Sequence, residues 1–166
     1  MASVTFKGTP MTLIGNEVKV GDQAPDFKVL DNDLNEVSLS DFKGQVKIIS
    51  VVPSVDTGVC AAQTKRFNDE AEKINNVKVL TVSMDLPFAQ KRWKEANQIQ
   101  HVEIYSDHKD ASFGESYGVL MQELRLLARS VFIIDENDKV TYTEYVSEGT
   151  NHPNYEAAVE AVKKLQ

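Results

Sequence analysis

Two largely apolar runs rich in β-branched residues dominate the hydrophobic pattern. They are residues 46–52 (VKIISVV) and residues 77–84 (VKVLTVSM). Runs of this length and composition are typical of strands that are buried on both faces of a sheet. The segment between them carries apolar residues at helical spacing, at Phe67, Ala71 and Ile74. The pattern predicts a strand, a helix and a second strand parallel to the first.

A second helix, a hairpin and a third helix continue the pattern. Leu86-Pro87-Phe88 predicts a helix start, because proline is tolerated in the first helical turn, and this helix extends to about Ala96. The runs 130–135 and 139–146 flank a polar turn and predict a β-hairpin. A last helix opens at Pro153 and carries an apolar stripe suited to packing on a sheet. That stripe consists of Tyr155, Ala158, Val159, Val162 and Leu165.

The N-terminal region predicts shorter strands. Apolar residues alternate at Val4 and Phe6 and again at Met11 and Leu13, with the breaker Gly-Thr-Pro between them, so we expect a small β-hairpin. Short strands are also predicted near residues 27–30 and 36–39. Together these elements predict an α/β chain with a thioredoxin-like fold, in which helices flank a mixed β-sheet and an N-terminal β-hairpin is added.

The composition fits one domain that spans residues 1–166. The chain is 42% hydrophobic and 26% charged, and no repeat or linker divides it. Its net charge of -7, without any long basic run, argues against a nucleic-acid partner. The apolar stretches are too short for a signal peptide or a membrane span, so we expect no membrane partner and a cytoplasmic location.

Cys60 is the single cysteine of the chain, which excludes an internal disulfide, a CxxC redox pair and a zinc site built from several thiolates. A lone cysteine is either a small buried hydrophobe or a reactive thiol. Its place in the first turn of the predicted helix favours the reactive thiol, because free backbone N–H groups and the helix dipole stabilise a thiolate there. Thr57 either caps this helix or turns its hydroxyl toward a reacting oxygen, and the two roles are compatible.

The segment from Pro53 to Cys60 (PSVDTGVC) resembles the signature of the peroxiredoxin family, which is Pro, three residues, Thr, two residues, Cys. Three further segments narrow the resemblance to the bacterial thiol peroxidase subfamily, and they read GDQAPDF, DLPFAQ and LLARS. The resemblance implies that Cys60 is the peroxidatic cysteine. It also implies that Thr57 hydrogen-bonds the thiolate and the peroxide, and that Pro53 shields the substrate pocket.

Arg129 looks like the arginine that this family places beside the sulfur. A guanidinium there favours the thiolate and can donate to the peroxide oxygens. Arg125 is a nearby competitor, which we interpret as a surface residue. Lys94 stands where many members of the subfamily carry a second, resolving cysteine. A Cys60 sulfenic acid would then be reduced by an external thiol, either thioredoxin or a small thiol, in preference to a disulfide between two copies of Cys60.

The sequence therefore predicts a thiol peroxidase that reduces hydrogen peroxide and organic hydroperoxides. A noncatalytic thiol-based redox sensor is the alternative, since the chain lacks a resolving cysteine. The resemblance also implies a homodimer. No metal or other cofactor is predicted, because residues 31–36 lack the glycine of a calcium loop and residues 106–110 are interpreted as a polar surface loop.

Overall fold

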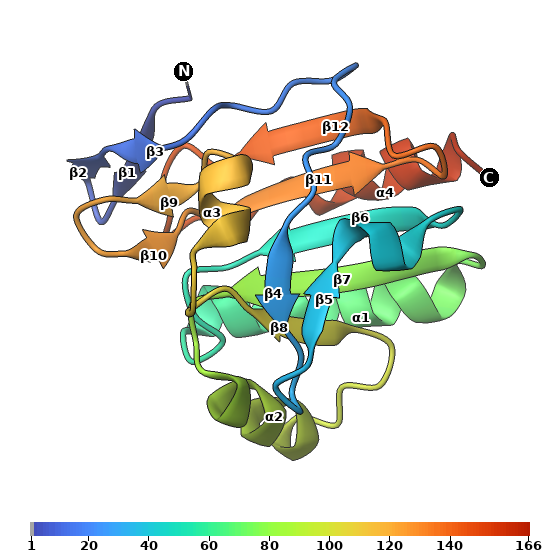
Figure 1. Cartoon of the computed structure of the whole chain (residues 1–166), viewed down its shortest axis with the longest axis horizontal. Helices are drawn as coiled ribbons and strands as arrows, with labels where there is room; N and C mark the ends of the chain where they lie inside the picture. Colours follow the sequence, from blue (N-terminus) through green and yellow to red (C-terminus); the bar gives the residue numbers. More distant parts are fainter. Residues whose placement is uncertain (1) are drawn as a thin grey trace.

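The computed structural model describes residues 2–166, which form an α/β thioredoxin-like fold around one mixed sheet. The sheet has seven strands in the order β12-β11-β6-β7-β8-β4-β5 (Figure 1). At its centre β6 (Val46–Val51), β7 (Val77–Ser83) and β8 (Glu103–Ser106) run parallel to one another. The outer strands are antiparallel to their neighbours, and they are β4 (Lys28–Leu30), β5 (Glu36–Ser38), β11 (Ser130–Ile134) and β12 (Val140–Tyr145).

Helices lie on both faces of this sheet. Figure 1 shows α1 (Gly58–Lys73) and α4 (Tyr155–Lys163) behind the sheet and the short α3 (Ser112–Ser116) in front of it. The remaining helix, α2 (Pro87–Ala96), packs against β8. Successive side chains of a strand point to opposite faces, so Ile48 packs in the core layer under α1 and α4 while Ile49 packs in the layer under α3.

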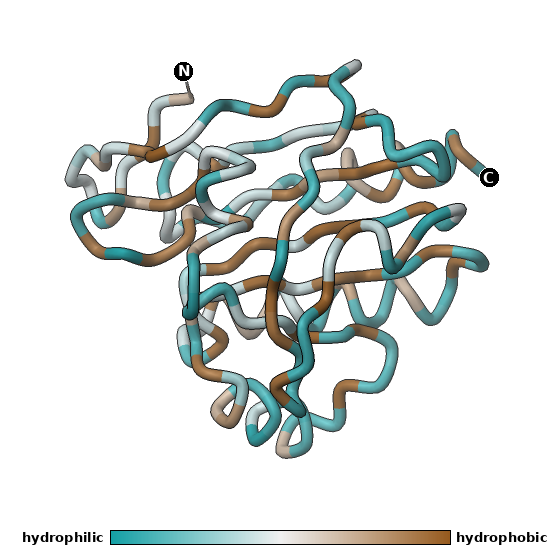
Figure 2. Tube along the Cα trace, in the orientation of Figure 1, coloured by the Kyte–Doolittle hydropathy of each residue, from teal (hydrophilic) through white to brown (hydrophobic). Residues whose placement is uncertain are grey.

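Hydrophobic positions, in brown, recur along the central strands in Figure 2, and most of these side chains are buried. Among the charged residues of these strands, Lys47 of β6 is completely buried. Its ammonium group forms an ion pair with Asp138 and also donates to the carbonyl of Asp135 across 3.4 Å. A buried ammonium needs such partners, so this contact fixes the β11–β12 turn to the start of β6.

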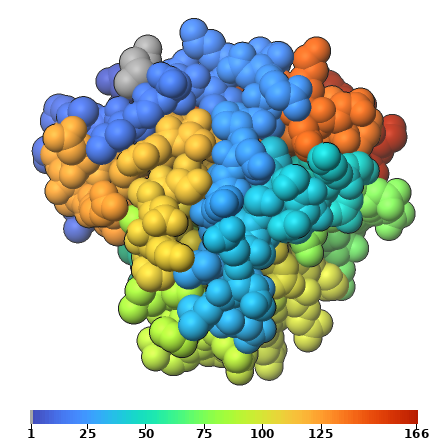
Figure 3. Space-filling model, viewed as in Figure 1, coloured from blue at the N-terminus to red at the C-terminus, as the bar shows by residue number. Residues whose placement is uncertain are grey.

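The predicted N-terminal hairpin is present. It consists of β1 (Val4–Phe6) and β2 (Thr9–Met11), with the turn at Lys7 and Gly8. Leu13 belongs instead to β3 (Leu13–Ile14), which pairs with β9 (Leu120–Met121), and β9 pairs in turn with β10 (Leu126–Leu127). Figure 3 shows this N-terminal segment, in dark blue, against the orange segment that carries β9 and β10. The hairpin therefore sits beside the loop that leads to Arg129.

Several predicted boundaries shift by one or two residues. The predicted strand at residues 36–39 ends at Ser38, because Leu39 begins the short 3-10 helix η1 (Leu39–Phe42). The last helix begins at Tyr155 and is capped by Asn154, whose side chain accepts the N–H of Ala157, so it does not open at Pro153.

Among the described residues, no helix is long and apolar enough to cross a membrane.

The prediction of a polar surface loop at residues 106–110 is wrong for its first two residues. Ser106 ends β8 and is completely buried, and Asp107 is only 2% exposed. The Asp107 carboxylate accepts the backbone N–H groups of Phe113 and Gly114 at 2.9 and 2.8 Å, so it ties this segment to α3. Burial raises the pKa of Asp107 to about 6, against the opposing effect of these two hydrogen bonds.

Candidate active site

Cys60 lies in the first turn of α1, as the sequence predicts, and its side chain is completely buried. Thr57 is the N-cap of this helix: its backbone is extended, with φ -99° and ψ 154°, and its Oγ1 accepts the N–H of Cys60 at 3.3 Å. None of the hydrogen bonds among residues 2–166 uses the Thr57 hydroxyl as a donor. The geometry therefore leaves that proton available to an incoming oxygen atom.

Arg129 reaches the sulfur from the segment between β10 and β11. Its Nη2 donates to the Sγ of Cys60 at 3.3 Å, its Nε donates to the carbonyl of Gly149 at 2.9 Å, and its Nη1 donates to Oε1 of Gln63 at 3.0 Å. The side chain is only 2% exposed, and no carboxylate of the described chain forms an ion pair with it. A buried guanidinium without a carboxylate is costly, and a thiolate at Cys60 would supply the missing negative charge.

Gln63 is a site residue that sequence reasoning missed. It is completely buried one helical turn after Cys60, and its Nε2 donates to Oγ of Ser50 at 2.8 Å while its Oε1 accepts from Arg129. Gln63 thus links the end of β6 to the guanidinium. A signal was present, because a polar residue occupies a position on the apolar side of α1, four residues before the buried Phe67.

The loop between β6 and α1 is held by Asp85, which sequence reasoning also missed. The Asp85 carboxylate accepts from Oγ of Ser54 at 2.7 Å, from the N–H of Val55 at 2.9 Å and from Oγ of Ser83 at 2.6 Å. These contacts join the loop to the end of β7. Because the loop carries Pro53 and leads into the cap of α1, Asp85 fixes the position from which the cysteine helix begins.

The four residues singled out from the sequence gather at one small pocket of about 310 Å³. Pro53, Thr57 and Arg129 line this pocket, and Cys60 lies beneath it in contact with Arg129. Most of the surface that lines it is apolar. The other lining residues are Phe6, Lys7, Gly58, Val59, Gly149 and Thr150.

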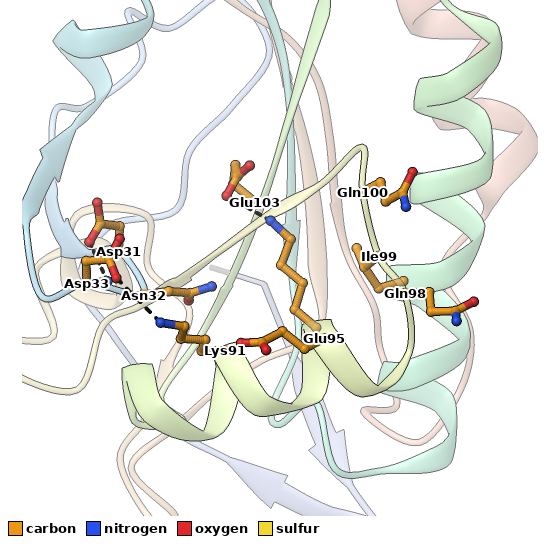
Figure 4. A pocket seen from close by; sticks show the side chains of 10 residues that line it. Asp31, Asn32, Asp33, Lys91, Glu95, Gln98, Ile99, Gln100 and Glu103 are labelled. Atoms are coloured by element: carbon orange, nitrogen blue, oxygen red, sulfur yellow. Dashed lines mark hydrogen bonds and ion pairs between the residues drawn. The ribbon is translucent and has the colours of Figure 1, made fainter.

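A larger, polar pocket of about 710 Å³ lies elsewhere, between α2 and the turn after β4 (Figure 4). It contains Lys94, the residue at the place of the resolving cysteine, whose ammonium group forms an ion pair with Glu103 at 3.0 Å. Lys91 and Asp33 form a second ion pair across it, at 3.7 Å. Neither Cys60 nor Arg129 lines this pocket, so its size does not make it the site of the thiol chemistry.

Arg125 is exposed, in agreement with its interpretation as a surface residue. Its backbone lies in the left-handed region, with φ 51°, at the turn between β9 and β10.

The side chains within residues 2–166 form no group of three or more His, Cys, Asp or Glu that could hold a metal ion. Asp31 instead organises its own loop, because its Oδ1 accepts the N–H groups of Asp33 and Asn35, each at 2.9 Å.

Comparisons with known proteins identify the family of this chain. The Redoxin family model matches residues 19–159. The chain is 67% identical to a thiol peroxidase of Bacillus subtilis over 99% of both chains, and 65% identical to one of Halalkalibacterium halodurans over 98% of both.

Solved structures of similar proteins have the same fold. A peroxiredoxin-like protein from Aquifex aeolicus is 46% identical and superimposes with a TM-score of 0.94 over 100% of this chain and 98% of that one. A thiol peroxidase from Chromobacterium violaceum, at 18% identity, shares the fold with a TM-score of 0.89 over 98% of this chain and 96% of that one. The chain therefore belongs to the Redoxin family, and within it to the thiol peroxidase group of the peroxiredoxins.

Proposed function

We propose that this protein is a thiol peroxidase that reduces hydrogen peroxide and organic hydroperoxides at Cys60. The observation that carries the proposal is the buried guanidinium of Arg129, which donates to the Sγ of Cys60 at 3.3 Å beside an open pocket. The guanidinium and the start of α1 together favour the thiolate, which is the nucleophilic form of cysteine. The thiol peroxidase relatives, at more than 60% identity over nearly the whole chain, support the same activity.

The first chemical step is an in-line attack by the thiolate on one peroxide oxygen. An S–O bond forms as the O–O bond breaks, so the sulfur loses two electrons and the peroxide gains them. The leaving oxygen departs as hydroxide or alkoxide and takes up a proton, giving water or an alcohol, while Cys60 becomes a sulfenic acid.

Arg129 and Thr57 can stabilise the charge that moves during this step. The Arg129 guanidinium lies beside the sulfur and can donate to the peroxide oxygens as negative charge develops on the leaving one. The Thr57 hydroxyl lies at the helix start and lines the same pocket. Pro53 is buried at the pocket wall and keeps water from the sulfur on that side.

An external thiol completes the cycle, because the sequence contains no second cysteine. One thiol attacks the sulfenic sulfur and releases water, and a second thiol reduces the mixed disulfide and restores Cys60. Thioredoxin or a small thiol can serve as this reductant. A disulfide between two copies of Cys60 is disfavoured, since two completely buried sulfurs would both have to leave their pockets to meet.

We also propose that the chain acts as one domain, as a homodimer, and in the cytoplasm. The dimer rests on the resemblance to peroxiredoxins. The cytoplasmic location is supported by the single unpaired cysteine, which suits a reducing compartment. Size-exclusion chromatography with light scattering tests the dimer.

The proposed activity is tested by following peroxide loss in excess dithiothreitol for the wild type and for Cys60→Ser. We expect many turnovers per chain for the wild type and none above background for the variant. A single stoichiometric oxidation without turnover would instead support the redox sensor, which no observation favours over the enzyme.

A further inference from the structure

The carboxylate of Glu148 joins two segments that border the Cys60 pocket. Its Oε1 accepts from Oγ1 of Thr5 at 2.8 Å and from the N–H of Gly8 at 2.9 Å. Its Oε2 accepts from the N–H of Lys7 at 3.2 Å, and from the N–H and Oγ1 of Thr150 at 2.7 and 2.6 Å. Both oxygens therefore accept hydrogen bonds. These bonds lower the pKa of Glu148, and the largest effect comes from the Thr150 hydroxyl.

The turn of the N-terminal hairpin has a conformation that needs such support. Lys7 and Gly8 both lie in the left-handed region, with φ of 52° and 81°. This region is unfavourable for a lysine, and the two N–H groups at the turn point to one carboxylate rather than to water alone. The Glu148 side chain thus stabilises the tip of a two-stranded hairpin that has little support of its own.

The tip held by Glu148 forms part of the pocket wall. Phe6 and Lys7 line the same pocket as Thr57 and Arg129. Phe6 lies against the backbone of Gly149, since a Cβ atom at that glycine would come within 2.5 Å of the phenyl Cδ2. Phe6 therefore supplies an apolar surface in the wall of this pocket.

The base of the hairpin is held independently of the Glu148 side chain. Backbone hydrogen bonds run from the N–H of Thr5 to the carbonyl of Ser147 at 2.8 Å and from the N–H of Gly149 to the carbonyl of Thr5 at 2.7 Å. The carbonyl of Gly149 accepts in turn from Arg129. Loss of the carboxylate should therefore release Phe6 and Lys7 at the tip while Arg129 keeps its place.

We propose that Glu148 is a positioning residue that holds the hairpin tip at the Cys60 pocket and so keeps Phe6 against the organic group of a bulky, apolar hydroperoxide. This inference rests on the proposed peroxidase function. Hydrogen peroxide has no organic group and does not use the Phe6 surface. Glu148 thus determines substrate specificity without taking part in the chemical step.

The test compares the full-length wild type with Glu148→Ala, using cumene hydroperoxide and hydrogen peroxide with dithiothreitol as reductant. For Glu148→Ala we expect kcat/KM for cumene hydroperoxide to fall about tenfold through KM, with kcat and the hydrogen peroxide parameters within about twofold of wild type. Hydrogen exchange at the amides of Lys7 and Gly8 should become faster. Glu136→Ala, which changes an exposed glutamate of the β11–β12 turn, is the matched control and should behave as wild type.

An unchanged ratio between the two substrates, or an equal loss with both, would overturn the role of Glu148 while leaving the peroxidase intact. A wild type that does not turn over would remove the proposed function and this inference together. If Glu148→Ala fails to fold, Thr5→Val takes its place. That variant removes one donor to the carboxylate and keeps the backbone pairing, so cumene hydroperoxide should lose about threefold in kcat/KM, and no selective loss would contradict the inference.

Discussion

The guanidinium of Arg129 donates to the Sγ of Cys60 at 3.3 Å, although 69 positions separate the two residues in the sequence. Two further bonds, to the carbonyl of Gly149 and the side chain of Gln63, fix the plane of the guanidinium. The cation is therefore in place before a peroxide arrives, which is the condition for stabilising charge without reorganisation. We therefore propose that the reactivity of Cys60 depends on both the helix start and this buried cation.

Replacement of Arg129 by lysine tests the geometry of the cation. An ammonium group keeps the charge but cannot maintain three planar contacts at once, so we expect Arg129→Lys to lose about 10²-fold in kcat/KM for hydrogen peroxide. Iodoacetamide should also alkylate Cys60 more slowly at neutral pH. Arg125→Lys, at an exposed position, is the control and should keep wild-type kinetics. Equal activity of the two variants would show that the guanidinium is not required.

Replacement of Gln63 by leucine tests whether Gln63 holds Arg129 in place. Gln63→Leu leaves the Nη1 group of Arg129 and the hydroxyl of Ser50 without a partner in a buried site, which should cost roughly 1–3 kcal/mol of unfolding free energy. Urea denaturation measures this loss. Gln100→Leu, at an exposed position, should change stability by no more than about 0.5 kcal/mol. The same small effect at Gln63 would contradict its structural role.

The lysine at the place of the resolving cysteine should be dispensable for turnover. Lys94 forms an ion pair with Glu103 in a polar pocket away from Cys60, and the Glu103 side chain is 44% exposed. Lys94→Ala should therefore cost roughly 0.5 kcal/mol of stability and leave dithiothreitol-dependent peroxide reduction within about twofold of wild type. A large loss of turnover, measured in the same coupled assay, would mean that Lys94 takes part in the reductive half of the cycle.

The buried carboxyl of Asp107 should stabilise the folded protein at low pH and cease to do so as the pH rises. Burial raises its pKa from 3.8 to about 6, so the folded protein binds this proton more tightly than the unfolded chain does. The resulting stabilisation is complete below pH 3.8 and is lost as the pH rises through about 6. The shift corresponds to roughly 2–3 kcal/mol.

Asp107→Asn removes this titration. The unfolding free energy of the wild type relative to the variant should therefore decrease across that pH range, as measured by urea denaturation at a series of pH values. Asp69→Asn, at an exposed position on α1, is the control and should give a profile parallel to the wild type. A parallel profile for Asp107→Asn would contradict the raised pKa.

The hydrophobic pattern predicted the elements whose signal is local and long. Strands β6 and β7 are nearly continuous apolar runs, and α1 carries apolar residues at helical spacing at Phe67 and Ala71, so these strands and this helix could be predicted. The pattern did not reveal β8, which has only four residues and owes its place to pairing with β7. It also missed α3, because five residues that include a glycine carry no helical periodicity.

The residues of the candidate site fall into the same two groups, those with a local signal in the sequence and those without one. Cys60 and Thr57 lie in one segment, so their positions at a helix start could be predicted from neighbouring residues. The place of Arg129 came from the resemblance to a family, since no local pattern joins it to the cysteine. Gln63 and Asp85 act through contacts between elements that only the folded chain brings together.

The central claim is that the peroxide oxygen passes to the Cys60 sulfur. Its most direct measurement is mass spectrometry of the full-length protein after one equivalent of peroxide without reductant, in the presence of dimedone, which adds to sulfenic acids. We predict one dimedone adduct per chain, located at Cys60, and none in Cys60→Ser. Consumption of the peroxide without an adduct or other oxidation at Cys60 would contradict the account.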